Sequence, residues 1–286
     1  MPVYNPEESV LHQAIASVQA QLYPRWELCI ADDASTAPHV ARVLSAAAAK
    51  EPRIKVIRRA SNGNISAASN SALSLAQGEF VALMDHDDLL AEHALYEVAV
   101  ELDAHGDADL IFSDEDKIDR RGHRFDPHFK TDWSAELMLG QNMVSHLGVY
   151  RRSLLERLGG FRVGFEGSQD YDLALRVSEQ TTPERIRHIP AILYHWRHGL
   201  AVDTFSQSRL AQCTAAARRA IAEHLDRVGE RGAEVVPHPA MPAFTRVIRP
   251  LPDPAPLVSL IVPTRDRAEL LARCVDGLLR RTDYRP

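Results

Sequence analysis

Three short apolar runs in the first 116 residues end in acidic side chains, and helical patterns separate them. The runs cover residues 26–33, 78–88 and 108–116, and their acidic ends are Asp32–Asp33, Asp85–Asp88 and Asp114–Asp116. Alternation of strand and helix predicts a parallel α/β sheet with right-handed crossovers. Because ligands bind beyond the carboxyl ends of parallel strands, the three acidic ends predict a polar binding site at one edge of this sheet.

The chain opens with the signature of a helix start. Asn5 is a suitable N-cap, Pro6 suits the first helical position, and Glu8 lies three residues after the cap. Apolar residues then recur at helical spacing: Val10, Leu11, Ala14, Ile15 and Val18. We therefore predict a helix that buries this face.

The end of the chain repeats this opening. In "LVSLIVPTRDRAELL", Pro263, Asp266 and Glu269 match Pro2, Asn5 and Glu8 at a shift of 261 residues. An apolar strand-like run, Leu257–Val262, precedes Pro263, whereas only Met1 precedes Pro2. We interpret residues 257–286 as the truncated start of a second copy of the first domain. The pattern also suggests that Val258–Val262 could fill the missing first-strand position of a first domain.

Composition narrows the functional class. The net charge of -6 argues against a general nucleic-acid binder, which would normally carry a basic surface. The apolar runs are too short to span a bilayer. Peripheral attachment to a membrane stays open.

The segment Asp85-His86-Asp87-Asp88 is the strongest candidate site. In an extended segment, residues two apart face the same side, so Asp85 and Asp87 would present two carboxylates to one ligand. Mg²⁺ and Mn²⁺ favour oxygen ligands, and neighbouring carboxylates repel one another without a cation. Metal binding is therefore favoured for Asp85 and Asp87. For Asp88, capping of the next helix is an equally good explanation.

Two further segments leave structural and ligand-binding roles open. Asp32–Asp33 would either bind a nucleobase or ribose, or cap the helix that follows. Asn64 belongs to a turn that would cap a helix or contact a ligand, and the small Ala67 would let a ligand approach the backbone.

The second half of the chain holds two more such candidates. Asp170 lies in the first turn of a predicted helix, where it would complement the helix dipole or act as a general base. His195 and Arg197 would be a metal ligand and a phosphate-binding group, or part of an exposed basic turn.

Seven segments, in order over about residues 2 to 200, together resemble the family-2 glycosyltransferases, which are inverting enzymes of the GT-A fold. They are "PVYNPEE", "IADDAST", "SNGNISAASN", "MDHDD", "SDEDKID", "GGFRVGFEGSQDYDLALR" and "YHWR". The later segments look like bacterial enzymes of O-antigen and related surface-polysaccharide assembly, which often carry two such domains in tandem. The resemblance implies an α/β nucleotide-diphospho-sugar transferase fold, with a mostly parallel mixed sheet flanked by helices and an apparently truncated first strand.

The resemblance also implies a role for each candidate. The nucleotide-sugar donor would be bound by Tyr4, Asp32, Asp33, Asn64, Ala67, Asp85, His86 and Arg197. The DXD motif, Asp85 and Asp87, would hold Mn²⁺ or Mg²⁺ together with His195. Asp170 would be the base that deprotonates the acceptor hydroxyl.

The expected activity is metal-assisted, inverting transfer of a hexosyl or deoxyhexosyl group. The donor would be of the UDP or dTDP type, and the acceptor a growing polysaccharide or a lipid-linked saccharide. The expected location is the cytoplasm, with the inner face of the cytoplasmic membrane left open. The alternative is a non-catalytic nucleotide-binding fragment of a larger two-domain glycosyltransferase. A nucleotidyltransferase would need a Gly-rich phosphate loop, which "MPVYNPEES" lacks.

These inferences predict three segments: a GT-A domain over 1–231, a Pro-rich linker over 232–256, and the second start over 257–286. Two departures from the family pattern stand out. Ala34 replaces the usual Gly after the double Asp, and "GLAV" at 199–202 replaces a Gly-Ser-Thr-Ala segment.

Overall fold

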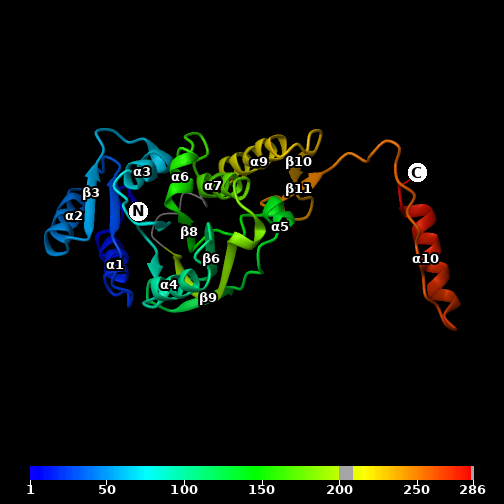
Figure 1. Ribbon diagram of the computed structural model, residues 1–286, viewed down its shortest axis with the longest axis horizontal. Coiled ribbons are helices and arrows are strands. Elements are labelled where there is room, and N and C mark those ends of the chain that lie inside the picture. Colours follow the sequence, from blue (N-terminus) through cyan, green and yellow to red (C-terminus); the bar gives the residue numbers. More distant parts are fainter. Residues whose placement is uncertain (200–208, 285–286) are drawn as a thin grey trace. The chain divides into compact units, whose positions relative to one another are not determined.

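The computed structural model describes residues 1–199 and 209–284, which divide into two compact units, Met1–Val247 and Ile248–Pro286. Within the first unit, helices pack on both faces of a layer of β-strands (Figure 1). In the described residues, no helix is long and apolar enough to cross a membrane.

The elements are named as in Figure 1. The helices are α1 (Glu8–Gln19), α2 (Pro38–Lys50), α3 (Asn64–Leu73), α4 (Ala94–Ala104), α5 (Ala135–Gly140), α6 (Arg152–Arg157), α7 (Gln169–Ser178), α9 (Leu210–Arg227) and α10 (Ala268–Arg281), with the short 3₁₀ helix Pro183–Arg185. The strands are β1 (Pro2–Val3), β2 (Leu28–Asp32), β3 (Ile54–Arg58), β4 (Phe80–Ala82), β5 (Leu89–Leu90), β6 (Leu110–Ile118), β7 (Arg124–His128), β8 (Gly148–Arg151), β9 (Ile186–Arg197), β10 (Glu234–Pro237) and β11 (Thr245–Ile248).

The first part of the chain has the predicted alternation of strand and helix. Strands β1, β2 and β3 form a parallel sheet in which Val3 pairs with Asp32 and Asp32 with Arg58. Helix α1 buries the predicted face, namely Val10, Leu11, Ala14, Ile15 and Val18. Burial of these side chains against the sheet supplies most of the helix's stability, since short helices are marginal in water.

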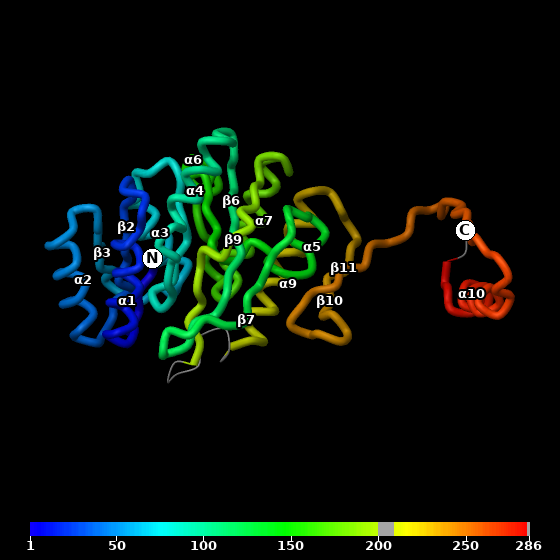
Figure 2. The backbone as a smooth tube through the Cα atoms, turned by 90° about the horizontal axis from the view of Figure 1, so that it is seen from below, coloured from blue at the N-terminus to red at the C-terminus, as the bar shows by residue number. Residues whose placement is uncertain are grey.

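The second sheet is mixed and has the strand order β4-β8-β6-β9-β5, with β7 paired to β6. Strands β6 and β9 run parallel, whereas β8 is antiparallel to both β4 and β6. Figure 2 shows β6 and β9 running side by side in the middle of the first unit. Because β4 and β8 are antiparallel, the loop 142–147 before β8 lies next to the acidic segment 85–88 after β4. The candidate site lies where these two segments meet.

The boundary of the first unit differs from the predicted one. Residues 234–248 contain the hairpin β10–β11, and Ala233, Val235 and Val247 pack against a buried apolar cluster. The first unit therefore extends to Val247 rather than ending at residue 231, because this part of the predicted linker buries apolar side chains.

The two stretches of the predicted internal repeat share their local backbone. Asn5 has φ 47° and Asp266 has φ 52°, so both matched residues adopt the left-handed conformation that short polar side chains tolerate. Each is followed by a helix, α1 and α10. That residues 257–286 begin a second domain stays a prediction.

A cavity of about 840 Å³ lies beside β2, next to the short strand β1. Strand β1 pairs only with Ala31 and Asp32, while Leu28 and Cys29 line the cavity together with β4 from the opposite side. Apolar side chains of α3 and α4 line it as well. The prediction that Val258–Val262 fills the missing first-strand position is not confirmed, because residues 257–262 form no strand and Ile261 is 91% exposed.

We predict that a strand fused ahead of Met1 will stabilise the first unit. The Met1 amino group is buried and donates to the carbonyl of Cys29 at 2.8 Å, and burial lowers its pKa to about 6. Adding a copy of Leu257–Val262 before Met1 replaces this buried amine with a peptide N–H and lets apolar side chains fill the cavity. Thermal unfolding should show a midpoint raised by roughly 5 °C. A Gly-Ser extension of equal length is the control, and an equal effect of both extensions would refute strand insertion.

Candidate functional site

The acidic segment after β4 forms a turn rather than the predicted extended strand. Strand β4 ends at Ala82, and His86–Asp87 form the turn that precedes β5. In a turn, residues three apart approach each other, so Asp85 and Asp88 come together instead of Asp85 and Asp87. The structure therefore groups Asp85 with Asp88, while the pairing of Asp85 with Asp87 on one ligand stays a prediction.

Asp88 is held by the surrounding fold. Its side chain is buried and accepts hydrogen bonds from the Tyr194 hydroxyl and the Arg197 backbone N–H, both at 2.7 Å. Burial, followed by the charges of Asp87 and Asp85, raises its pKa well above the ordinary value. Burial also raises the pKa of Asp87.

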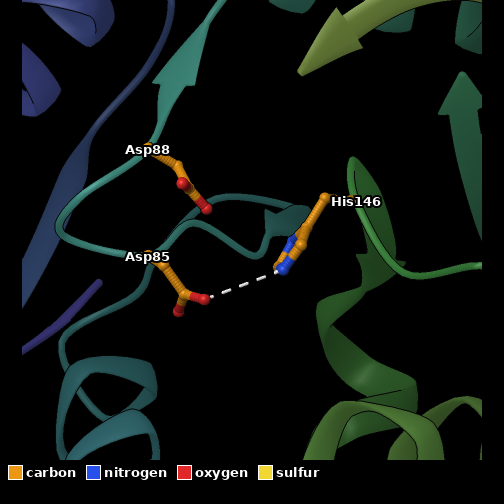
Figure 3. Close-up of side chains that lie close together, drawn as sticks. All are labelled: Asp85, Asp88 and His146. Atoms are coloured by element: carbon orange, nitrogen blue, oxygen red, sulfur yellow. Dashed lines mark ion pairs between the residues drawn. The ribbon is translucent and has the colours of Figure 1, made fainter. Parts of the chain in front are cut away.

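A histidine that the sequence did not single out lies opposite Asp85. The His146 Nε2 is 3.7 Å from the Asp85 carboxylate, and the ring is nearly parallel to that of Tyr194, with centroids 4.4 Å apart. Figure 3 shows His146 reaching from a different segment toward Asp85 and Asp88. Its Nδ1 is buried without a hydrogen-bond partner among the described residues.

The loop that carries His146 also reaches Asp170. Asn142 Nδ2 donates to Asp170 Oδ2 at 2.8 Å. Burial raises the pKa of Asp170, and the nearby charge of Asp85 adds to this, while His146 acts in the opposite direction. Asp85, His146 and Asp170 line the same cavity. The structure thus joins two predicted site residues through the loop 142–147, to which no motif pointed.

The residues predicted to bind the donor base, Asp32 and Asp33, lie at the carboxyl end of β2. Asp32 Oδ1 accepts from the Ser35 backbone N–H at 2.9 Å. Asp33 accepts from the Gly63 backbone N–H at 3.0 Å and forms an ion pair with Arg59 at 2.7 Å. Asp33 therefore holds together the loops after two neighbouring strands.

The other predicted donor residues surround this edge. Val3 pairs with Asp32, so Tyr4, which is 47% exposed, follows directly beside the double Asp. Asn64 is exposed and begins α3, and Ala67 on that helix is half-buried. His86 Nδ1 lies 3.2 Å from the carbonyl oxygen of Pro2. Their roles toward a donor stay predictions.

The departure at Ala34 has a conformational cost. Ala34 has φ 59°, in the left-handed region that glycine adopts without penalty. A side chain there costs about 1–2 kcal/mol relative to glycine. The second departure, "GLAV", lies largely in residues 200–208, outside the described residues.

Arg197 and His195 are both buried and bonded within the fold, and their roles toward a donor or a metal stay predictions. Arg197 is buried, and its Nε donates to the Asp87 carbonyl at 2.7 Å and its guanidinium to Gln13 at 2.8 Å. These bonds hold the acidic turn in place. His195 Nδ1 is 2.5 Å from Asp116 Oδ1, and burial lowers the pKa of this histidine. The structure brings His146, and not His195, next to Asp85 and Asp88.

The third acidic cluster is part of the fold. Strand β6 continues to Ile118, so Asp114 and Asp116 lie within the strand and not at its end. Both are buried: Asp114 pairs with His188 at 2.9 Å, and Asp116 pairs with His195.

The donor set fits a divalent cation. Asp85, Asp88 and His146 each offer a ligand atom, and these atoms lie within 4.8 Å of one another. Carboxylate and imidazole groups together suit ions such as Mn²⁺. The carboxylate of Asp85 is the most accessible, since its side chain is 38% exposed. That Asp87 contributes to such a site stays a prediction.

Comparison with known proteins identifies the family and the fold of this chain. The sequence profile described as "Glycosyl transferase family 2" matches residues 1–159. The chain is 46% identical over 284 residues to the uncharacterized protein y4gI of Sinorhizobium fredii, covering 99% of this chain and 31% of that protein. It is 42% identical over 283 residues to the O-antigen biosynthesis protein RfbC of Myxococcus xanthus, covering 99% of this chain and 22% of that protein. The chain thus spans a third or less of these two curated relatives.

A solved structure shows the same fold. The crystal structure of S. aureus TarS 1-349 in complex with UDP-GlcNAc superposes with a TM-score of 0.62 and 20% identity, covering 78% of this chain and 64% of that one. The fold is therefore the α/β GT-A fold that the sequence predicted. Since the family profile matches more than half of the chain, the protein belongs to glycosyl transferase family 2.

Proposed function

We propose that residues 1–247 bind a nucleotide-diphosphate sugar and transfer its sugar, with inversion, to an acceptor hydroxyl. The observation that carries this proposal is the loop 142–147, which contacts Asp85 through His146 and Asp170 through Asn142. One cavity therefore presents a carboxylate near a candidate cation site and a second carboxylate suited to proton transfer. The UDP-GlcNAc bound by TarS and the O-antigen role in the name of RfbC support the donor type and a surface-polysaccharide acceptor.

Asp170 is the proposed base. It accepts the proton of the acceptor hydroxyl while that oxygen attacks the anomeric carbon from the face opposite the leaving group. The bond between the anomeric carbon and the diphosphate oxygen breaks, and the nucleotide diphosphate leaves with the electron pair. Inversion needs a base only on the acceptor side, and a carboxylate with a raised pKa is a stronger base than an exposed Asp.

Asp85, Asp88 and His146 are the residues that would hold a divalent cation. Bound there, Mn²⁺ or Mg²⁺ would neutralise charge that develops on the leaving diphosphate. Asn142 orients Asp170 through its hydrogen bond, and Arg197 holds the turn that carries Asp87 and Asp88.

Nucleotide binding is the first test of this proposal. UDP and dTDP, each with and without Mn²⁺, are added to the full chain and thermal unfolding is measured. Saturation at 100 times Kd stabilises a protein by about 2.7 kcal/mol, so a shift of roughly 5–10 °C is expected for one nucleotide with Mn²⁺. The Mn²⁺-dependent part of the shift should disappear in Asp85→Asn and in His146→Ala, but not in Asp126→Asn, which changes an exposed acid on β7.

Turnover separates an enzyme from a nucleotide-binding fragment. With the nucleotide sugar whose nucleotide gives a shift, release of nucleotide diphosphate should be detectable in the presence of a saccharide acceptor or by slow hydrolysis. Binding without any turnover would favour the non-catalytic alternative. No shift with any nucleotide would overturn the donor-site assignment.

A further inference from the structure

We propose that Lys130 is a positioning residue that sets the distance between Asp85 and Asp170 by anchoring the loop 142–147. This inference rests on the proposed function for the role of the two acids, while the anchoring itself is a property of the fold. Lys130 lies after β7 and contacts neither acid.

Lys130 is buried at the base of the loop. Its side chain is 1% exposed, and its Nζ donates to the Val144 carbonyl at 2.8 Å, the His146 carbonyl at 2.7 Å and Glu115 Oε2 at 3.0 Å. An ammonium has three donors, so every one of them is used. Two of the three bonds go to backbone of the loop, and an ionised donor makes them stronger than neutral hydrogen bonds.

Glu115 completes the anchor. Its Oε2 also accepts from the His146 backbone N–H at 3.1 Å. The Lys130–Glu115 pair therefore holds His146 by both its backbone N–H and its carbonyl.

The anchored loop 142–147 positions the side chains that contact Asp85 and Asp170. Asn142 Oδ1 accepts from the Ser145 backbone N–H at 3.1 Å, which closes the loop on itself. From this closed loop, the Asn142 amide holds Asp170 and the His146 ring faces Asp85. The two acids come from distant parts of the chain, and this loop is the element that contacts both.

Removal of the ammonium should release the loop. Without it, two loop carbonyls lose their partner and the Glu115 carboxylate stays buried without its lysine. A displacement of about 1 Å at a catalytic group can cost about 10²-fold in rate. The acids that would bind the nucleotide base, Asp32 and Asp33, are held by other loops and should keep their positions.

The experiment compares Lys130→Met with Lys130→Gln and with the control Lys117→Met in the full chain. Lys117 lies on the neighbouring strand β6 and pairs with Asp126 on the surface, so its loss leaves the loop intact. Gln keeps one side-chain donor group and is the milder variant if Met lowers the yield of folded protein. The readouts are hydrogen exchange of residues 142–147, kcat and donor KM for turnover, and binding of UDP.

We expect Lys130→Met to speed exchange in the loop at least tenfold and to lower kcat by about 10–100-fold, with UDP binding within twofold of the unmodified chain. Lys130→Gln should fall between these values, and Lys117→Met should match the unmodified chain. A uniform rise in exchange throughout the first unit, or a loss confined to UDP binding, would refute positioning through the loop. If no donor is turned over by the unmodified chain, the proposed function fails, and the exchange result still decides whether Lys130 anchors the loop.

Discussion

Replacing Asp170 with Asn is expected to lower kcat by about 10³-fold, because general-base catalysis typically contributes 10²–10⁴-fold. Asn has the same shape and still accepts the hydrogen bond from Asn142, so the fold and UDP binding should be kept. Turnover of the nucleotide sugar and UDP binding are measured on the same preparation. The loss should therefore appear in kcat and not in the affinity for the nucleotide.

Glu166→Gln is the matched control for this change. Glu166 lies in the loop before α7 and accepts hydrogen bonds from the Gly164 backbone N–H, without contact to Asp170. The Glu166→Gln change should reduce kcat less than threefold.

The base must be ionised to accept a proton, and burial raises the pKa of Asp170. On acidification, activity should therefore decline at a higher pH than it would with an exposed Asp as the base. Retention of more than a tenth of the activity in Asp170→Asn would assign the base to another group.

Replacing Asp172 with Ala is expected to lower the free energy of unfolding by about 3–5 kcal/mol, which is the usual cost of breaking a buried ion pair by removing one partner. Asp172 is fully buried, accepts from Arg176 Nε at 2.9 Å, and accepts from Arg162 through one Nε–H shared by both carboxylate oxygens at 3.1 Å and through Nη2. Alanine leaves Arg176, whose side chain is only 8% exposed, without its carboxylate. The thermal midpoint should fall by roughly 10 °C.

Glu223→Ala provides the matched comparison. Glu223 also pairs with Arg162, at 2.6 Å, but its side chain is 38% exposed. Exposed pairs contribute about 0–1 kcal/mol, so this change should move the midpoint little. Equal losses for the two variants would mean that burial does not set the strength of the Asp172 pair. Asp170 and Asp172 thus lie two residues apart on one helix, and we expect one to control rate and the other stability.

The fold could be predicted in large part from local pattern. The apolar face of α1, the strands β2 and β3, and the start of α3 follow from residues close together in the sequence. Periodicity did not locate the ends of β4 and β6. Strand β4 ends early because the acidic segment turns, and β6 continues through Asp114 and Asp116 because those buried acids have partners: His188 for Asp114, and His195 and Arg124 for Asp116.

Of the candidate site, the sequence predicted only the acidic residues. Asp85 and Asp170 were recognised because carboxylates at a strand end or a helix start have a distinct local context. Asn142, His146 and Lys130 were missed because each is an isolated polar residue that forms no recognisable motif with its neighbours in the sequence. The sequence favoured His195 as a metal ligand, and in the structure its Nδ1 contacts Asp116.

The amino-acid sequence by itself determined the family, the strand-and-helix order of the first domain and the carboxylates at its edge, because these depend on short-range patterns. Tertiary structure alone decided which histidine faces Asp85 and which amide holds Asp170. Those contacts depend on the antiparallel register of β8 with β4 and β6, which places the loop 142–147 beside the turn after β4. Register is set by packing between strands that are far apart in the chain, so no local pattern records it.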